Sequence, residues 1–523
     1  MARPGKERGI TTPHSLTRVL IGRREFLRRL SALSGAAASS SALRALAATP
    51  NPSTQLHVII AGAGLAGLVA AYELERRGHR VTILEADPRH IGGRARTLRF
   101  DGGLHGEAGA MRIPTRHELT RRYIAEFHLP LRPFVFSNPQ AYYFVRGQRR
   151  RVAEVKSLYG LFALREDERN QTPDSFWDAA VGKALRSLSD DEKVDLSADT
   201  PATNRVRAYD QQSLQQLFEA AGLSDEAIEF LATTSASETL LASAATETLR
   251  EELKEVWSQG FDELVNGTDT LASAFAARLK SKPKLGCSVV RLTQDTLTRR
   301  TAAIYREGGV ERRAEGDFLL CTLPCPVLTR IGVEPELSGP KWRAIRELNY
   351  DSSTKVLAIA RRRFWESEDG IFGGGTFTDL PIATAYYPSD NALPKDPRVS
   401  AGPGVLLASY SWGQVARRLA SLPHAERAAA VLQHLSRVHP QLKHAGLIRH
   451  TASWSWDNHP LSGGAFAWFM PGQHSALHRD LVAPEGRIYF AGEHASLTHT
   501  WMQGALESGL RAVREMLEAA QRG

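Results

Sequence analysis

Hydrophobic and polar positions follow a regular pattern from residue 55 onward. The run "LHVIIA" is apolar apart from His57 and predicts a buried strand. An Ala- and Leu-rich stretch with apolar positions at helical spacing follows it as far as Arg77. Gly78 ends this predicted helix, and "RVTILEA" predicts a second strand that reaches Glu85. A strand, a helix and a second strand in this order predict a β–α–β unit with parallel strands.

Two longer regions have different patterns. Residues 115–255 have mainly helical periodicity and few strand-like runs. Residues 345–470 contain runs typical of strands, among them "STKVLAIARRRFW", "IATAYYP" and "GVLLASYSWG". Between these regions, "GCSVVRLTQDTLTRRTAAIYREGGVERRAEGDFLLCTLP" predicts a small antiparallel β insert that returns to a core strand. We therefore expect the α/β class (α+β, multi-domain), in which a discontinuous nucleotide-binding domain carries a helical domain and a β-rich domain.

Chain length and charge agree with a multidomain globular protein. The 523 residues exceed what one small core needs and favour two or three domains. The formal net charge is +9, but residues 1–50 hold nine Lys/Arg against two Asp/Glu, and the remainder holds 57 against 55. The excess charge therefore belongs to the N-terminal segment. Because the body is nearly neutral, we expect no nucleic-acid partner.

The N-terminal segment contains Arg23 and Arg24, followed by "EFL" and by a weakly apolar stretch rich in Ala, Ser and Leu. It resembles a bacterial twin-arginine export signal with a small-residue cleavage context near Ala45–Ala48. The resemblance implies a signal peptide over 1–48, the twin-arginine translocase as a partner, and a periplasmic or secreted protein. A basic disordered tail is the alternative. Arg44 and the many serines make a poor membrane span, so we expect no stable membrane insertion.

The cysteines give little functional signal. Cys287, Cys321 and Cys325 are odd in number and lack the spacing of paired metal ligands, so we expect neither a disulfide framework nor a metal site. Cys321 lies in the apolar run "DFLLCTLP", which predicts an inert thiol in the core.

The first predicted β–α–β unit contains a glycine motif. Gly62, Gly64 and Gly67 form a G-x-G-x-x-G pattern between the strand and the helix, with Glu85 about 20 residues farther on. Glycines permit a tight turn and a close approach of the backbone to a diphosphate, which the helix N-terminus attracts. Glu85 is placed to accept hydrogen bonds from a ribose. The pattern predicts a Rossmann-like dinucleotide site, and a purely structural turn is the alternative.

Two further stretches carry glycine and charged residues: "DPRHIGGRART", with Gly92, Gly93 and Arg94, and "YFAGE", with Glu493. These stretches resemble the FAD-binding signatures of the flavin amine oxidase family. The resemblance implies FAD as the cofactor, with Arg94 near its diphosphate and Glu493 near its ribityl–diphosphate region. The complete set of implied cofactor contacts is Gly62, Gly64, Leu65, Ala66, Gly67, Glu85, Ala86, Gly93, Arg94, Gly109, Ala110, Met111, Arg112, Val289, Trp454, Gly492, Glu493, Trp501, Met502, Gln503, Gly504 and Ala505.

A narrower resemblance covers about residues 55 to 518. The stretches "GAMRIP", "SSTKVLAIARRRFWESEDGIFGG", "TDLP" and "YFAGEH" resemble L-amino acid oxidases of the venom and bacterial types within the flavin monoamine oxidase superfamily. This resemblance implies a homodimer. It also sets the expected domains: FAD-binding parts at 55–114, 256–340 and 471–520, a helical domain at 115–255 and a substrate-binding β domain at 341–470.

The resemblance also implies a substrate site. Arg112 would bind the substrate carboxylate, which suits a planar guanidinium, and Tyr410 would donate to the same carboxylate. Trp412 lies two residues after Tyr410 on the same strand face and would line the side-chain cavity together with Trp501. Lys355 would hold a water near flavin N5, for flavin reoxidation or imine hydrolysis. From their residue types alone, Tyr410 and Trp412 would equally be core residues and Lys355 a surface residue.

Two positions depart from the family pattern. Glu251 stands where the venom enzymes have a mobile His, and two interpretations remain open. It is either an acid on a helix surface or an acid at the entrance of the substrate site that attracts cationic substrate side chains. Thr500 stands where a Gly is usual, which would narrow the site near the substrate amine.

The reaction implied by the resemblance is oxidation of an L-amino acid by O2 and water to a 2-oxo acid, ammonia and hydrogen peroxide. Hydride would leave Cα for flavin N5, with broad preference for large apolar or aromatic amino acids. The alternatives are selectivity for Lys and Arg, a tryptophan 2-monooxygenase-like reaction, a flavin-binding protein without turnover, and an NAD-dependent dehydrogenase.

Overall fold

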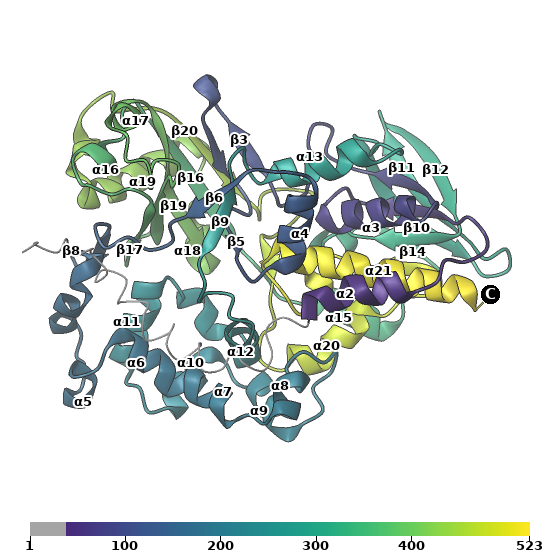
Figure 1. Cartoon of the computed structure of the whole chain (residues 1–523), viewed down its shortest axis with the longest axis horizontal. Coiled ribbons are helices and arrows are strands. Elements are labelled where there is room, and N and C mark those ends of the chain that lie inside the picture. Colours follow the sequence, from purple (N-terminus) through teal and green to yellow (C-terminus); the bar gives the residue numbers. More distant parts are fainter. Residues whose placement is uncertain (1–37, 523) are drawn as a thin grey trace, which may run out of the picture.

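The computed structural model describes residues 38–522 (Figure 1). A parallel sheet forms the base of the functional site. Its strands are β1 (His57–Ala61), β2 (Arg80–Leu84), β13 (Phe318–Cys321) and β22 (Ile488–Phe490), in the order β2-β1-β13-β22. All three pairs of neighbouring strands are parallel. Most residues of these strands are buried, as expected where both faces of a sheet are covered. Three distant segments of the chain therefore build one sheet.

Helices and a second sheet cover the two faces of the parallel sheet. The helices α3 (Leu65–Arg76), α13 (Asp269–Arg278) and α21 (Met502–Gln521) pack together on the right side of Figure 1. The other face contacts a sheet of order β12-β11-β10-β14, formed by β10 (Cys287–Asp295), β11 (Arg300–Glu307), β12 (Val310–Gly316) and β14 (Gly332–Glu334). This sheet contains the antiparallel insert expected from the sequence.

A sheet of seven strands dominates the upper left part of the molecule in Figure 1, in the order β20-β16-β19-β18-β17-β7-β8. Its inner strand β16, between β20 and β19, is buried along its full length, which explains the apolar and small residues in most of its positions. The strands are β7 (Tyr142–Val145), β8 (Gln148–Arg151), β16 (Ser353–Ala360), β17 (Gly374–Thr378), β18 (Thr384–Tyr387), β19 (Gly404–Trp412) and β20 (Ile448–Ser455).

The segment expected to be helical, 115–255, therefore also supplies strands to this sheet. Its pair β7 and β8 extends the sheet through β17. The strand β6 (Leu131–Phe134) joins β9 (Phe261–Leu264) and β5 (Ile113–Pro114) in a three-stranded sheet. These strands are only four or two residues long, too short to give a clear alternating pattern.

Two further groups of helices lie near the large sheet. One group lies below the large sheet in Figure 1 and consists of α5 (Glu166–Arg169), α6 (Pro173–Trp177), α7 (Lys183–Ser187), α8 (Asp190–Asp195), α9 (Asn204–Gln211), α10 (Leu214–Ala220), α11 (Asp225–Ser235) and α12 (Ala245–Leu253). The other consists of α16 (Phe364–Ser367), α17 (Pro397–Ala401), α18 (Gly413–Ala420) and α19 (His424–Val438), near the large sheet. The short pairs β3 (Thr97–Arg99) with β4 (His105–Glu107) and β15 (Tyr350–Asp351) with β21 (Phe466–Ala467), and the helices α4 (Glu118–Glu126), α14 (Cys325–Leu328), α15 (Gly339–Glu347) and α20 (Gln473–Val482), complete the fold.

The N-terminal part of the described chain is a helix, α2 (Ala38–Ala48), that packs on the body. It contacts α21 and α4, and the side chain of Leu46 is fully buried. The guanidinium of Arg77 donates to the Leu46 carbonyl at 3.0 Å. Arg23 and Arg24 of the expected export signal lie outside the described residues.

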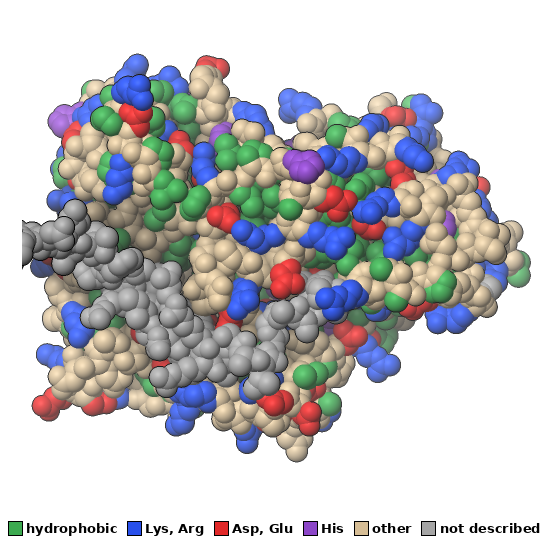
Figure 2. Space-filling model, in the orientation of Figure 1, with side chains coloured by type: hydrophobic (Ala, Val, Ile, Leu, Met, Phe, Trp, Pro, Cys, Tyr) green, Lys and Arg blue, Asp and Glu red, His purple; other side chains and the backbone are tan. Residues whose placement is uncertain are grey.

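The surface and the cysteines add two observations. Figure 2 shows basic and acidic side chains intermingled over the described part of one face. No helix in residues 38–522 is both long and apolar enough to cross a membrane. All three cysteines are buried free thiols, and burial raises the pKa of Cys321 to about 11, consistent with the expected inert core thiol.

Candidate active site

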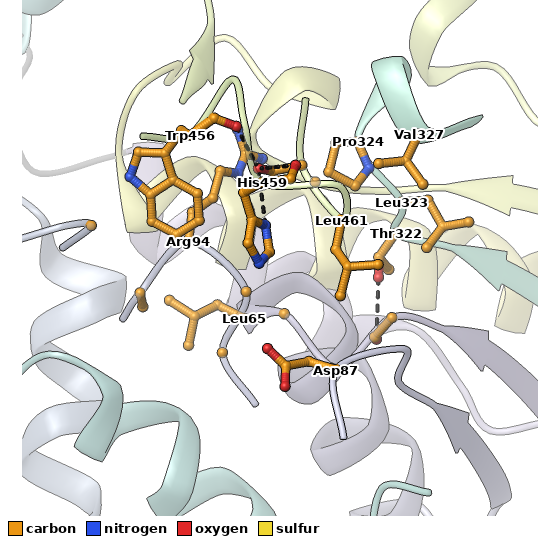
Figure 3. A pocket seen from close by; sticks show the side chains of 18 of the residues that line it. Leu65, Asp87, Arg94, Thr322, Leu323, Pro324, Val327, Trp456, His459 and Leu461 are labelled. Carbon is orange, nitrogen blue, oxygen red and sulfur yellow. Dashed lines mark hydrogen bonds between the residues drawn. The ribbon is translucent and has the colours of Figure 1, made fainter. Parts of the chain in front are cut away.

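A first cavity of about 480 Å³ lies at the carboxyl ends of β1, β2 and β13. Open α/β sheets bind their ligands at this edge. Figure 3 shows Arg94, Trp456 and His459 on one side of this cavity and Thr322, Leu323 and Pro324 on another. Of the cofactor contacts expected from the sequence, the cavity wall contains Gly62, Gly64, Leu65, Ala66, Glu85, Ala86, Gly93, Arg94, Gly109, Ala110, Val289, Gly492, Glu493, Trp501, Met502 and Ala505.

Two glycines of the first motif have different structural roles. Gly64 is the N-cap of α3 with extended backbone, and a Cβ there would meet nothing within 4 Å. A Cβ at Gly67 would lie 2.2 Å from the Gly62 carbonyl oxygen. Gly64 therefore leaves open space at the start of α3, whereas Gly67 lets the helix pack closely against the preceding turn. The open space beside an N-terminal turn suits an anionic group.

Glu85 lies at the end of β2, in the wall of the first cavity. Its carboxylate accepts hydrogen bonds from the backbone N–H groups of Ala63 and Asp87, both at 2.8 Å. Burial raises the pKa of Glu85, although these hydrogen bonds oppose the shift. The Cys287 N–H donates to the Glu85 carbonyl at 2.8 Å, which brings β10 and Val289 to the same end of the cavity. Glu85 is thus held in place for a ribose.

An ion pair joins the first and last segments of the chain at this cavity. Arg94 donates to Glu493 at 2.8 Å and to the Ala465 carbonyl at 3.1 Å. Glu493 also accepts from the N–H groups of Ala467 and Thr500, at 2.9 and 3.1 Å. Burial alone would raise the pKa of Glu493, but the Arg94 charge and the other donors hold it below its usual range. The carboxylate therefore stays charged and fixes the turn before α21.

Thr500 and Trp501 lie between Glu493 and α21. Thr500 has a φ of 68°, a left-handed conformation that glycine adopts at lower cost than a β-branched residue. Trp501 is the N-cap of α21, and no side chain among the described residues caps this helix. The first turn of α21 therefore has free N–H groups, and its residues Met502 and Ala505 line the first cavity. This turn suits the partial negative charge of a flavin pyrimidine ring.

The structure differs from the expected contact at Trp454. Trp454 does not line the first cavity but packs under Arg96, whose guanidinium carbon lies 4.4 Å from the ring centroid. Trp456 lines the cavity instead, and its indole N–H donates to the Ala108 carbonyl at 2.9 Å. β20 ends at Ser455, so the chain turns and places Trp456 toward the cavity. At the strand end to which the resemblance pointed, the structure thus places Trp456 in the cavity wall and Trp454 outside it.

Four other expected contacts lie behind the cavity wall. The Met111 sulfur accepts from the Lys355 ammonium at 3.4 Å, and the Gln503 side chain accepts from the Thr120 backbone N–H at 3.0 Å. A Cβ at Gly504 would lie 2.1 Å from the Thr498 carbonyl oxygen. These residues and Gly67 support the wall and do not line it. Sequence reasoning missed Trp456, Thr322 and His459, which line the cavity but lie in no motif with its own chemical signature.

A second cavity of about 1030 Å³ adjoins the first. Tyr410 on β19 lines both cavities, so the two meet at its side chain. Trp412 lies beside Tyr410, with ring centroids 5.4 Å apart, and lines the second cavity. Burial raises the pKa of Tyr410, so its hydroxyl stays protonated and can donate. Other aromatic residues of this wall are Phe136, Tyr143, Trp177, Trp257, Phe377 and Tyr386.

Arg112 lies in the wall of the second cavity with only 8% of its surface exposed. Its guanidinium carbon lies between 5.0 and 5.9 Å from four ring centroids, those of Trp257, Phe136, Phe261 and Trp501. Such contacts are worth about 0.5–2 kcal/mol each. The Nε and Nη1 atoms of Arg112 are buried without a hydrogen-bond partner among the described residues. A buried cation with unpaired donors favours an anionic partner, and a carboxylate is a common partner of a guanidinium.

Lys355 on β16 lies where the two cavities meet. Its ammonium donates to the Gly109 carbonyl at 2.6 Å and lies 4.5 Å from the Tyr410 ring centroid. Burial lowers the pKa of Lys355 to about 7, opposed by the nearby Glu107 carboxylate and assisted by the Arg112 charge. Burial in turn raises the pKa of Glu107. From its residue type alone, Lys355 would be a surface residue of a strand, but the structure buries it at the first cavity. Its ammonium can lose a proton near neutral pH.

Glu251 does not lie on an exposed helix surface. It lines the second cavity, and its two carboxylate oxygens accept from the indole N–H groups of Trp257 and Trp501, both at 2.7 Å. Burial raises its pKa, although the two indoles and the Arg112 charge oppose the shift. The first of the two interpretations left open by the sequence is therefore wrong.

The fold and the first cavity together define a dinucleotide-dependent oxidoreductase. A glycine turn at the start of α3, an acid after β2, and a second uncapped helix N-terminus at α21 line one cavity. The extra Arg94–Glu493 contact and the α21 turn suit FAD, which carries a flavin beyond its diphosphate. The residues present thus fit FAD, and the protein is an FAD-dependent oxidoreductase.

Comparison with known proteins makes the assignment narrower. Residues 65–517 match the family described as flavin containing amine oxidoreductase, and the chain belongs to this family. It is 34% identical over 472 residues to an L-amino-acid oxidase of the fish Siganus canaliculatus, covering 88% of this chain and 85% of the relative. It is 31% identical over 488 residues to an L-amino-acid oxidase of Gloydius blomhoffii, covering 91% of each chain.

The solved structures support the fold. A putrescine oxidase bound to putrescine has a TM-score of 0.71 at 20% identity, covering 89% of this chain and 99% of that chain. At this identity the likeness bears on the fold and not on the substrate. Among the described residues, no cluster of His, Cys, Asp and Glu side chains is arranged to hold a metal ion.

Proposed function

We propose that the protein is an L-amino acid oxidase. The reaction converts an L-amino acid, O2 and water into a 2-oxo acid, ammonia and hydrogen peroxide. The observation that carries the proposal is Arg112, a buried guanidinium with two unpaired nitrogens in the wall of a cavity that adjoins the cofactor cavity. The relatives named L-amino-acid oxidases support it.

The chain's own residues bind and orient the substrate. Arg112 holds the α-carboxylate through its unpaired N–H donors, and the neutral Tyr410 hydroxyl donates to the same group. With the carboxylate held at the junction of the cavities, Cα faces the first cavity and the side chain extends into the second. Bound FAD supplies the two-electron oxidation by accepting hydride from Cα at N5. Fixing the substrate in this way accounts for a large part of a rate enhancement.

Lys355 acts after the substrate is oxidised. Its ammonium points to the Gly109 carbonyl at the wall of the first cavity, where it can hold a water or stabilise negative charge as O2 is reduced. Its lowered pKa allows it to release and regain a proton near neutral pH.

The proposed substrates are large apolar and aromatic L-amino acids. The second cavity is far larger than a small side chain needs, and Trp412, Trp257 and Tyr386 contribute aromatic walls. A preference for Lys or Arg is the second candidate, because Glu251 lines the same cavity.

A peroxide-coupled screen of all L- and D-amino acids on the purified yellow protein tests the proposal. We expect bleaching of the flavin absorbance under nitrogen, and peroxide with 2-oxo acid in air, for L-amino acids only. Amide and CO2 in place of peroxide would identify a monooxygenase. Absence of both flavin reduction and peroxide with every L-amino acid would refute the proposal.

We also propose export and a homodimer. The Arg23-Arg24 segment supports export through the twin-arginine translocase to the periplasm or the medium. Expression of the full chain in bacteria with and without an Arg23→Lys/Arg24→Lys change tests this, with loss of the exported protein expected for the variant. Light scattering of the purified holoenzyme tests the dimer.

A further inference from the structure

Glu251 connects two tryptophans that come from different parts of the chain. It lies on α12, Trp257 follows that helix, and Trp501 precedes α21. Each indole N–H donates to a different oxygen of the Glu251 carboxylate, at 2.7 Å. The length of one side chain therefore sets the distance between the two indoles.

The same two indoles are walls of the Arg112 site. The guanidinium carbon of Arg112 lies 5.0 Å from the Trp257 ring centroid and 5.9 Å from that of Trp501. The two rings also contact each other, with centroids 5.7 Å apart and an interplanar angle of 66°. A shift of either indole would change the space available to the guanidinium.

Neighbouring residues of α12 hold the chain segment that contains Trp501. Glu247 contacts the His499 Nδ1 atom at 3.2 Å, and the Lys254 ammonium donates to the Thr498 hydroxyl at 3.1 Å. Glu251 lies between these two positions, about one helical turn from each. The helix thus runs beside residues 498–501 and gives Glu251 a rigid base.

We infer that Glu251 is a positioning residue that orients the Arg112 guanidinium toward the substrate carboxylate by fixing Trp257 and Trp501. This inference rests on the proposed function, because it concerns the carboxylate site. It differs from attraction of a cationic substrate side chain in one respect: attraction needs the charge of Glu251, whereas positioning needs its length as well.

Glu251→Asp separates these two accounts. The variant keeps the carboxylate but is one methylene shorter, so it cannot reach both indoles from the same helix position. Titration of the oxidised holoenzyme with benzoate, followed through the flavin absorbance, measures binding of a carboxylate without turnover. We expect the Kd for benzoate to rise about 10-fold, the scale of one lost charge-assisted hydrogen bond. Glu219→Asp, a matched change at an exposed acid outside both cavities, controls for the substitution itself.

A second variant keeps the inference testable if Glu251→Asp folds poorly. Trp257→Phe removes one indole donor and leaves the Glu251 charge in place. We expect Trp257→Phe to weaken benzoate binding as well. We expect the double variant to bind benzoate about as tightly as the Glu251→Asp single variant, because both changes break the same connection. Wild-type Kd values in both single variants would overturn the inference.

The substrate profile gives the remaining readout. With Leu, Phe, Lys and Arg as substrates, we expect Glu251→Asp to raise KM by a similar factor for all four, with a smaller effect on kcat. In Glu251→Gln, which removes the charge and keeps the side-chain length, a loss confined to Lys and Arg would instead establish Glu251 as a charge selector and overturn the positioning role. If wild-type enzyme neither binds benzoate nor oxidises any L-amino acid, the proposed function fails; if it does both and the variants match it, only this inference fails.

Discussion

The two cavities recognise their ligands by different means. The first cavity presents main-chain groups to its ligand: the open Gly64 position, the N-terminal turns of α3 and α21, and acids held by N–H donors. The second is walled by side chains, with Arg112 inside a set of aromatic rings. A cofactor shared by many enzymes can be bound through main-chain groups that a short motif encodes. A substrate of one chemical class needs side chains from several distant elements.

The largest expected effect is on the first cavity. Gly64→Val would place a side chain in open space at the N-terminus of α3, where the diphosphate is expected, while its extended backbone tolerates any residue. We expect loss of bound FAD, and with it all oxidase activity, without unfolding. The FAD-to-protein absorbance ratio and far-UV circular dichroism measure the two quantities. Gly339→Val, also at an open and exposed glycine, is the control; a yellow Gly64→Val enzyme would contradict the comparison.

The next effect is on the second cavity. Arg112→Lys keeps the charge but loses the planar pair of donors, so we expect kcat/KM for L-amino acids to fall about 100-fold. FAD content should stay at the wild-type level, because Arg112 lines the second cavity and not the first. Steady-state kinetics and the flavin spectrum test both statements. A colourless Arg112→Lys protein would show that Arg112 also contributes to FAD binding.

A smaller effect concerns Lys355, at the junction of the cavities. Burial lowers its pKa to about 7, so the ammonium is present below pH 7 and its charge is lost as pH rises through 7. If that charge assists O2 reduction, the reoxidation rate constant should fall as pH rises through 7. In Lys355→Met the rate constant should be about 10-fold lower below pH 7 and flat across this range. Stopped-flow mixing of reduced enzyme with oxygenated buffer measures it, and an unchanged pH profile in Lys355→Met would exclude the role.

The smallest effect tests backbone strain at the first cavity. Thr500 has a φ of 68°, and replacing it by glycine removes a steric cost of about 1–3 kcal/mol while adding about 0.5–1 kcal/mol of chain entropy to the unfolded state. We therefore expect Thr500→Gly to raise the free energy of unfolding by about 1 kcal/mol. Urea unfolding of the holoenzyme measures it, with Thr498→Gly, whose φ is not positive, expected to lower stability.

Sequence reasoning succeeded where chemistry is encoded locally. The G-x-G-x-x-G pattern and the strand before it predicted the first cavity, because a turn, a helix start and an acid at fixed spacing are properties of one short segment. It was less complete where short elements join distant partners. The strands β7 and β8 are four residues each, and nothing local shows that they extend a sheet built mainly from residues beyond 350. The sequence also does not show that Trp456 lines the cavity while Trp454 does not, because the end of β20 decides which ring faces it.

The sequence by itself determined the cofactor class, the arrangement of strands and helices around the glycine motifs, and the residue types available for a carboxylate. Only the tertiary structure decided that Arg112 is surrounded by four aromatic rings, that Tyr410 lies at the meeting of two cavities, and that Glu251 accepts hydrogen bonds from two indoles. The physical reason is that a charge's environment depends on neighbours that lie far away in the chain. Burial, partner donors and ring contacts set what Arg112 and Glu251 do, and none of these has a fixed spacing along the sequence.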